Sequence, residues 1–309
     1  MSFSIEVKNQ LCAVAIKNTE SAVAECYGML LFAKSFCSTK IAFSSTSEAA
    51  CDRLIYLLNL LFPKIIIDKK SFVKSQTTLR KQFTVQVPLA ADCAVVVEFF
   101  GHSDDDKNLR INRSNFESEE NYSDFLRGVF LSVGSVTDPQ KSYHLEFCVA
   151  YKKLCLDLAR LLTEAEHLEM FMPGVMQRKG LYVCYVKGSE TITDLLVLLG
   201  AQKAALQFMD EKALKQLRNH INRKTNSEVA NIEKSAAAAA MQIKAIQKLQ
   251  KTGLFNTLSP ELKQAAQLRL QYPEMSLRDL GRQFSPEVSR SGVNHRLEKI
   301  RKIALEQGE

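Results

Sequence analysis

Two apolar segments of the same pattern recur 100 residues apart, and this repetition limits the possible folds more than any other feature of the sequence. Each segment places a glycine among large apolar residues, in Tyr27-Gly-Met-Leu-Leu-Phe-Ala-Lys34 and in Arg127-Gly-Val-Phe-Leu-Ser-Val-Gly134. Because glycine has no Cβ, two helices can approach each other closely at Gly28 and Gly128. The repetition therefore predicts two pseudo-symmetric halves that pack against each other through these helices.

Hydrophobic periodicity around the two segments predicts similar elements in both halves. An apolar stripe at i, i+3 and i+4 indicates a helix, and alternating or β-branched runs indicate strands. For the first half we expect a helix at 22–36, a strand at 39–45, a helix at 47–62, strands at 63–70 and 81–88, and a helix at 89–100. For the second half we expect a helix at 123–136, a strand at 143–151, a helix at 152–167, a strand at 180–188 and a helix at 189–200. The pattern favours an α+β fold with two αββαββα units.

Two polar stretches divide the chain. Residues 101–124 hold no convincing apolar period, so we expect a linker over the surface between the halves. Residues 217–231 are also polar and lead into an alanine-rich helix, so we expect a hinge there, with occasional phosphate contacts from Arg223 and Lys224. The expected domains are 1–110, 111–212 and 213–309.

Positive charge is concentrated in the last third of the chain. Residues 218–309 carry 16 of the 41 Lys and Arg residues and 9 of the 34 Asp and Glu residues, which leaves 25 of each sign for the remainder. A segregated basic region is typical of a protein that binds a polyanion, most often nucleic acid. On charge alone, a solvated basic surface is the alternative.

Several classes of protein find no support in the sequence. No stretch approaches the roughly 18 apolar residues of a membrane span, and the first residues lack a signal-peptide pattern, so we expect a cytoplasmic location without membrane contact. The eight cysteines form no CxxC pair and the five histidines lack zinc-ligand spacing, which favours buried thiols over disulfides and metal ligands. No GxxxxGK[ST] or GxGxxG motif is present, so we expect no cofactor and no small-molecule substrate.

The basic region contains the pattern of a helix-turn-helix at about 275–306. A first helix is expected over 259–272, with a proline at its first position. A second follows Ser276, with Asp279 at the capping-box position. A third opens near Ser289. The apolar stripe of this third helix consists of Val293, Leu297, Ile300 and Ala304.

The third helix has the properties of a recognition helix, which lies in the major groove and presents its first residues to base edges. Asparagine suits adenine and arginine suits guanine in bidentate geometry, so we expect Asn294 and Arg290 to contact bases. We expect Lys299 and Lys302 to contact phosphates. The candidate DNA-binding residues are Ser276, Arg278, Ser289, Arg290, Ser291, Asn294, His295, Arg296, Lys299 and Lys302, together with Arg223 and Lys224. A helical bundle with a polar face is the alternative.

The paired glycine helices and the repeated units resemble the LAGLIDADG homing-endonuclease fold. That resemblance implies helices that cross at a pseudo-twofold axis, each ending in an acidic residue that binds a catalytic divalent metal. Ala33 and Val133 stand at these two positions, and neither offers the oxygen ligand that such a cation needs. We therefore expect no enzyme activity, and a residual metal-dependent endonuclease is the remote alternative. The neutral charge of the first two domains favours a structural or partner-binding scaffold over a DNA-binding surface.

Longer segments are similar to the WhiA family of bacterial regulators. They lie at 125–147, 222–249 and 276–304, the similarity spans essentially the whole chain, and Ser289-Arg-Ser-Gly-Val-Asn-His-Arg-Leu297 is its most specific part. The resemblance implies a degenerate LAGLIDADG-like domain followed by a helix-turn-helix similar to sigma-factor region 4. It also implies a transcription regulator associated with cell division, chromosome segregation and, in sporulating relatives, sporulation. The implied partners are duplex DNA at promoters and another transcription factor or RNA polymerase.

A second interpretation fits the same features. The protein would be a nucleoid-associated or cell-division adaptor, in which the first two domains bind a protein and the last domain binds DNA loosely. Few sharp promoter sites on the chromosome would favour the regulator, and broad coverage would favour the adaptor.

Overall fold

The computed structural model describes residues 2–73, 81–103, 109–164 and 172–306. Contacts divide the chain into two compact units, Met1–Lys215 and Gln216–Glu309. All eight cysteines lie in the described part of the first unit and are free thiols. Within the described residues, no helix combines the length and apolar character needed to cross a membrane.

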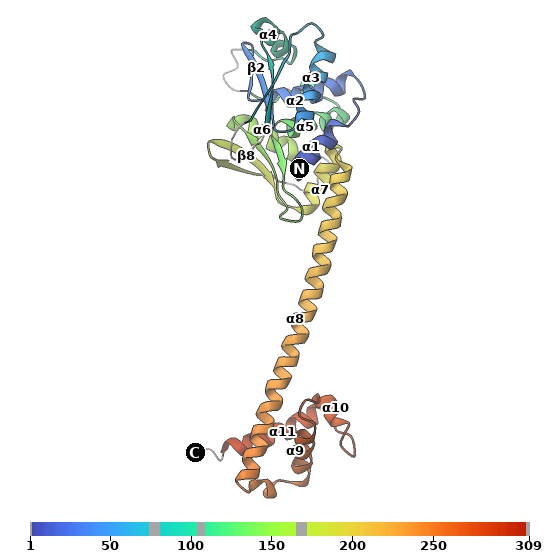
Figure 1. Ribbon diagram of the computed structural model, residues 1–309, viewed down its shortest axis with the longest axis vertical. Helices are drawn as coiled ribbons and strands as arrows, with labels where there is room; N and C mark the ends of the chain where they lie inside the picture. Colours follow the sequence, from blue (N-terminus) through green and yellow to red (C-terminus); the bar gives the residue numbers. More distant parts are fainter. Residues whose placement is uncertain (1, 74–80, 104–108, 165–171, 307–309) are drawn as a thin grey trace. The chain divides into compact units, whose positions relative to one another are not determined.

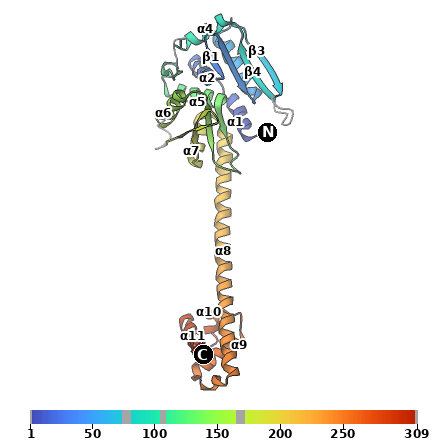
Figure 2. The same cartoon turned by 90° about the vertical axis from the view of Figure 1, so that its left-hand side faces the viewer.

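The first unit consists of two halves with the same order of elements, which confirms the expected α+β pair (Figures 1 and 2). The first half contains α2 (Thr19–Leu31), β1 (Ser35–Cys37), β2 (Lys40–Ser45), α3 (Glu48–Leu61), β3 (Asp68–Val73), β4 (Lys81–Val87) and α4 (Ala90–Phe99). The second half contains α5 (Glu119–Val133), β5 (Gly134–Val136), β6 (Leu145–Val149), α6 (Lys152–Thr163), β7 (Gly174–Arg178), β8 (Leu181–Val186) and α7 (Ser189–Leu199). A further helix, α1 (Phe3–Cys12), precedes both halves.

Each half has one antiparallel four-stranded sheet, with strand order β1-β2-β4-β3 in the first and β5-β6-β8-β7 in the second. In the first sheet Phe43 lies opposite Val85, and both belong to the core between sheet and helices. In the second sheet Phe147 lies opposite Cys184 in the equivalent way. The residues next to these in each strand point away from the core, to the outer face of the sheet, because side chains alternate between the two faces.

Helices α2 and α5 lie side by side at the centre of the unit (Figure 1). A Cβ at Gly28 would collide with the backbone carbonyl oxygen of Phe125, and a Cβ at Gly128 with that of Glu25. The two glycines therefore form the contact that the sequence predicts. One continuous core of large apolar side chains, including Tyr27, Phe125 and Phe130, surrounds this crossing.

Several local expectations were wrong. Four elements were not predicted, namely the helix α1 and the strands β1, β5 and β7. Strand β3 begins at Asp68 and not at residue 63. The expected linker 101–124 is shorter than predicted, because Ser118 accepts a hydrogen bond from the amide of Asn121 and starts α5 one residue later. Its residues 104–108, and residues 165–167 of the helix expected at 152–167, lie outside the described part of the chain.

The helix α8 (Gln202–Lys251) begins in the first unit and continues into the second. The polar stretch 217–231 belongs to this helix, so the hinge expected there is not an irregular segment. The reason is that α8 contains no glycine or proline, and alanine, lysine, arginine and glutamate all favour the helix.

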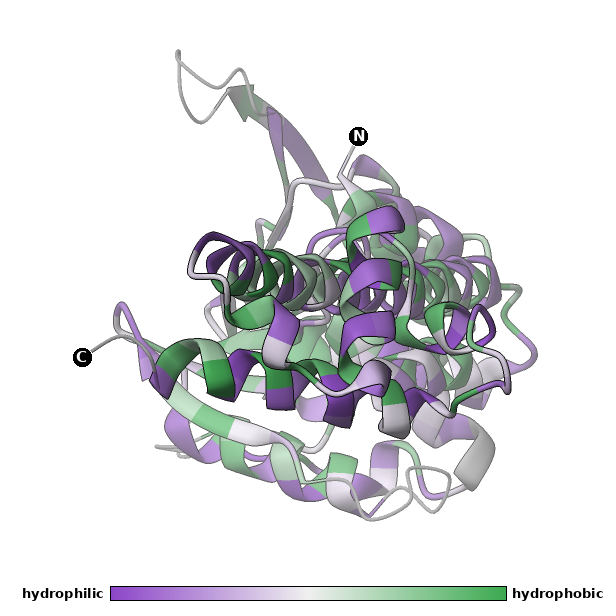
Figure 3. Ribbon diagram, turned by 90° about the horizontal axis from the view of Figure 1, so that it is seen from below, coloured by the Kyte–Doolittle hydropathy of each residue, from purple (hydrophilic) through white to green (hydrophobic). Residues whose placement is uncertain are grey.

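The second unit is helical. After α8 come a short 3-10 turn η2 (Leu254–Thr257), α9 (Pro260–Gln271), α10 (Leu277–Gly281) and α11 (Arg290–Glu306). Figure 3 shows hydrophobic and hydrophilic residues alternating along the ribbons, as expected of helices that bury one face. The buried residues of this unit are Ile246, Leu249, Leu258, Leu262, Ala265, Ala266, Leu280, Phe284, Val293, Leu297, Ile300 and Ala304.

Candidate DNA-binding interface

A closed turn joins α10 to α11. The Ser276 hydroxyl accepts a hydrogen bond from the amide of Asp279 (3.2 Å) and starts α10. At the other end of the helix, the Gly281 carbonyl accepts a hydrogen bond from the amide of Val288 (3.0 Å). A Cβ at position 281 would collide with the Val288 carbonyl oxygen, so only glycine fits. The turn therefore fixes where α11 begins.

A buried arginine holds the segment between α9 and α10. The Arg269 guanidinium donates hydrogen bonds to the carbonyl oxygens of Tyr272 (3.5 Å), Pro273 (3.4 Å) and Met275 (2.8 Å). Burial lowers the pKa of Arg269. Sequence reasoning missed this residue, because an arginine in a polar helix gives no signal that it is buried.

The exposed face of α11 carries most of the candidate DNA-binding residues. The apolar stripe packs into the unit, as expected from the sequence. The opposite side and its margins expose Arg290, Ser291, Asn294, His295, Lys299 and Lys302. This face is therefore free of the protein core and has donors of the kinds that contact base edges and phosphates.

Three other candidates already have structural contacts. The Ser289 hydroxyl accepts a hydrogen bond from the Gly292 amide (3.2 Å) at the start of α11. Ser276 caps α10. The Arg296 guanidinium lies over the Phe284 ring, 5.2 Å from its centroid, and 3.8 Å from the Glu261 carboxylate, with 23% of its side chain exposed. These three residues stabilise the fold of the second unit.

The remaining candidates lie on other elements. Arg278 is exposed on α10, and Arg223 and Lys224 are exposed on α8.

The outer faces of the two sheets carry different polar contacts. In the first sheet, the Ser44 and Thr84 hydroxyls lie 3.1 Å apart on this face. In the second sheet the Glu146 carboxylate accepts a hydrogen bond from Arg178 (2.7 Å) and contacts His144 (3.0 Å). Burial acts to raise the pKa of Glu146, but the contacts with Arg178 and His144 outweigh it and the net pKa is lowered. The Glu146 carboxylate therefore offsets the positive charge of Arg178 on this face of the second sheet and reduces its attraction for phosphate.

The LAGLIDADG resemblance implies a metal site at Ala33, just after α2, and at Val133, the last residue of α5, and these two residues do not fit a divalent cation. Ala33 and Val133 contribute no oxygen side chain. The Lys8 ammonium donates a hydrogen bond to the carbonyl oxygen of Leu131 (3.0 Å), in the last turn of α5. Nowhere in the described part of the chain do three His, Cys, Asp or Glu side chains cluster in a way that could hold a metal.

A network of buried charges lies where α2 and α5 cross. The fully buried Glu25 accepts hydrogen bonds from Arg53 (2.7 and 3.0 Å) and from Arg127 (3.2 Å). Arg127 also bonds to the carboxylate of Asp124 (2.6 Å) and the carbonyl of Leu199 (2.7 Å). These contacts join the two halves through charge-assisted hydrogen bonds.

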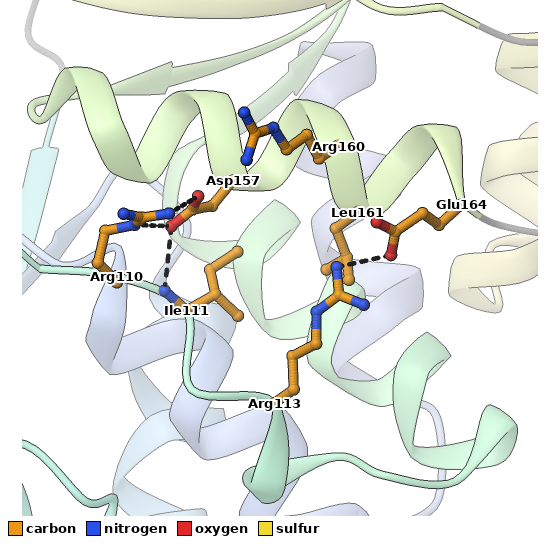
Figure 4. Close-up of a pocket in the computed structure, with 7 residues that line it drawn as sticks. All are labelled: Arg110, Ile111, Arg113, Asp157, Arg160, Leu161 and Glu164. Carbon is orange, nitrogen blue, oxygen red and sulfur yellow. Dashed lines mark hydrogen bonds and ion pairs between the residues drawn. The ribbon is translucent and has the colours of Figure 1, made fainter.

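One surface cavity of about 230 Å³ lies between residues 110–113 and α6 (Figure 4). Arg110 forms a bidentate pair with Asp157 (2.5 and 2.7 Å), and Arg113 pairs with Glu164 (2.6 Å). Because these arginines already have carboxylate partners, the cavity gives no evidence of a ligand site.

Together these features define a helix-turn-helix protein with a LAGLIDADG-like domain. Residues 122–218 match the model of the WhiA LAGLIDADG-like domain, and residues 221–304 match that of the WhiA C-terminal HTH domain. The chain belongs to the WhiA family.

Similar proteins extend over the whole chain. A probable cell division protein WhiA from Clostridium botulinum (strain Eklund 17B / Type B) is 34% identical over 99% of this chain and 98% of its own length. The corresponding protein from Clostridium beijerinckii is 33% identical over 99% and 98%. The crystal structure of full-length WhiA from Thermatoga maritima is similar over 100% of both chains, with a TM-score of 0.59 and 25% identity.

Proposed function

We propose that this chain is a sequence-specific DNA-binding transcription regulator that reads duplex DNA with α11. The observation that carries the proposal is the exposed face of α11, where Arg290 and Asn294 follow directly after the closed turn. Residues at the start of such a helix reach base edges in the major groove. Arginine pairs with guanine and asparagine with adenine through two hydrogen bonds each.

Contacts with the DNA backbone come from residues around the readers. Lys299 and Lys302 lie further along the exposed face of α11, and Arg278 is exposed on α10. Arg223 and Lys224 on α8 add positive charge to the same unit. Each lysine or arginine that neutralises a phosphate releases counterions, so these residues supply affinity that depends on salt but not on base sequence.

The LAGLIDADG-like domain acts without catalysis in this proposal. Ala33 and Val133 cannot hold a metal, and Glu146 neutralises Arg178 on the outer face of the second sheet. The domain serves as a scaffold that contacts another transcription factor or RNA polymerase. The names of the Clostridium relatives support a role in cell division, and we extend it to chromosome segregation and, in sporulating relatives, sporulation. The site of action is the nucleoid, in the cytoplasm.

The test is selection of duplexes from a randomised library by the full-length chain. We expect one enriched motif, bound at least about 1,000-fold more tightly than random duplex, as is usual for specific DNA binders. An Asn294→Ala chain should select a motif that has lost one or more defined positions. If the chain bound all duplexes of the library about equally well, this would contradict sequence-specific recognition. It would favour the second interpretation, an adaptor that binds DNA loosely.

A further inference from the structure

The helix α1 contacts the junction between α5 and β5 through two residues one turn apart. Lys8 donates a hydrogen bond from its Nζ to the carbonyl oxygen of Leu131 (3.0 Å). Ser4 accepts a hydrogen bond at its Oγ from the amide of Val136 (3.4 Å). Positions i and i+4 lie on the same face of a helix, so one face of α1 spans residues 131–136. Val133 lies within that span.

The contact with Leu131 meets a specific need of α5. The last carbonyl groups of a helix have no partner inside the helix, and they carry the negative end of its dipole. The Phe130 carbonyl accepts a hydrogen bond from the Gly134 amide, which follows the helix, and the Leu131 carbonyl accepts one from Lys8. The ammonium group thus provides both a donor and a positive charge where α5 ends.

Lys8 is held in this position by the core. Only 9% of the residue is exposed, and its neighbours Val7 and Leu11 on α1 are fully buried. A buried ammonium is costly unless a polar group compensates it. The chain nevertheless places one here, two residues before Val133, the position that the LAGLIDADG resemblance implies as a metal ligand.

We propose that the Lys8 ammonium is the built-in positive charge of this helix end, and that through Lys8 the helix α1 closes the former metal position of the second half to divalent cations. In this account a lysine supplied by the chain has replaced a cation taken from solution. Restoring the acidic residues alone would therefore not restore metal binding, because a fixed ammonium would pair with the new carboxylate and repel the cation. The proposal concerns the first unit and does not rest on DNA binding by α11.

The test uses full-length chains and the binding of Mn²⁺, measured by the loss of the free-ion electron paramagnetic resonance signal. The first chain carries Ala33→Asp and Val133→Asp, which put carboxylates at the two former ligand positions. The second adds Lys8→Met, and the third adds Lys8→Gln, which keeps a hydrogen-bond donor without the charge. The control adds Lys64→Met, which removes an exposed lysine from the same unit.

We expect the chains with Lys8→Met and Lys8→Gln to bind Mn²⁺ at least 10-fold more tightly than the chain with Lys8 and the control. Equal binding by all four chains, or binding by none, would overturn the proposal. Binding restored by Lys8→Met but not by Lys8→Gln would also overturn it, since the charge would then not be the cause of exclusion.

A second measurement needs no substitution and so does not depend on the variants folding. An amine-reactive ester followed by mass spectrometry reports how fast each lysine of the native chain is modified. We expect Lys8 to react at least 10-fold more slowly than Lys64. Equal rates would show that the ammonium is open to solvent and would overturn the proposal.

Discussion

At the residue scale, α11 separates side chains that hold the unit together from side chains that face solvent. Arg296 lies over Phe284 and beside Glu261, and Ser289 starts the helix through the Gly292 amide. Arg290 and Asn294 are exposed. The sequence places these residues at or near the start of one helix, but it does not show which of them stabilise the fold and which are free to contact DNA. That distinction depends on Phe284, which lies in the turn and packs against Arg296.

The first prediction concerns the two proposed base readers. We expect Arg290→Ala and Asn294→Ala each to reduce the preference for the selected duplex over a random duplex by about 10- to 100-fold, since a bidentate base contact contributes about 1–3 kcal/mol of discrimination. Fluorescence anisotropy with both duplexes measures the preference. Gln267→Ala, at an exposed position of α9, is the control and should leave it unchanged. Equal weakening of both duplexes by the two variants would mean that these residues contact only the backbone.

The second prediction concerns Lys8 and pH. Burial lowers the pKa of Lys8 from 10.5 to about 8, so between these values the unfolded chain keeps a proton that the native chain has released. Stability rises with pH wherever the unfolded state binds more protons. The free energy of unfolding of the native chain should therefore rise relative to that of Lys8→Met between pH 8 and pH 10.5, by at most about 3 kcal/mol.

Urea denaturation of both chains at pH 7.5 and pH 10 measures this difference. Cys12 on α1 and Cys51 on α3 are the titratable groups whose charge acts on Lys8, and burial raises the pKa of each thiol to about 12. With a pKa of about 12 both thiols stay largely protonated in the native chain at pH 10, and their own titration is common to the two chains. A difference in stability that stays constant with pH would contradict the assignment of a buried ammonium.

At the scale of elements, two close approaches of the backbone depend on glycine. Gly28 and Gly128 let α2 and α5 cross, and Gly281 lets the turn before α11 close on the Val288 carbonyl. The paired glycines were predictable from their repetition along the chain. The role of Gly281 was not, because it depends on a loop that returns to the end of α10.

The third prediction is that Gly281→Ala destabilises the second unit. The new Cβ would collide with backbone and not with a flexible side chain, so the turn has to shift. We expect a loss of at least about 2 kcal/mol, in the range of other overpacked positions, and weaker DNA binding because α11 is displaced. Thermal melting and anisotropy measure the two effects, with Gln283→Ala in the same turn as the control. Unchanged melting and binding would show that the turn can accept a side chain.

The fourth prediction concerns the pair of halves. Glu25→Gln leaves Arg53 and Arg127 without their shared counter-charge, and removing one partner of a buried ion pair costs about 3–5 kcal/mol. The exposed Glu48→Gln, which pairs with Lys69, should cost less than about 1 kcal/mol. Chemical denaturation gives both values. A similar small loss for both variants would mean that the network contributes little to the packing of α2 against α5.

At the scale of the whole molecule, the order of the large elements could be predicted from the sequence, and several connections could not. Helices α3 and α6 and strands β2, β4, β6 and β8 were predicted because they have clear apolar patterns. Strands β1 and β5 have three residues each, too few to show a period. The helical residues 217–231 have no apolar face against a core, so periodicity gave no signal there. The contact of Lys8 with Leu131 joins residues 123 positions apart, which no local pattern indicates.

Charge is the other property of the whole molecule that bears on function. The excess positive charge lies in residues 218–309, which carry 16 basic and 9 acidic residues and include α9, α10 and α11. The rest of the chain has no net charge. Phosphate neutralisation is therefore expected to come from the second unit, and the dependence of DNA affinity on salt should report on it.

The most direct test of the central claim is the salt dependence of duplex binding by the full-length chain and by a chain with Lys299→Ala and Lys302→Ala. If α11 lies on the DNA, the double variant should lose about two units of the slope of log affinity against log salt, at about 0.9 per phosphate contact. Its preference for the selected duplex should be retained. An unchanged slope would contradict the account, because the DNA would then be bound by another part of the chain.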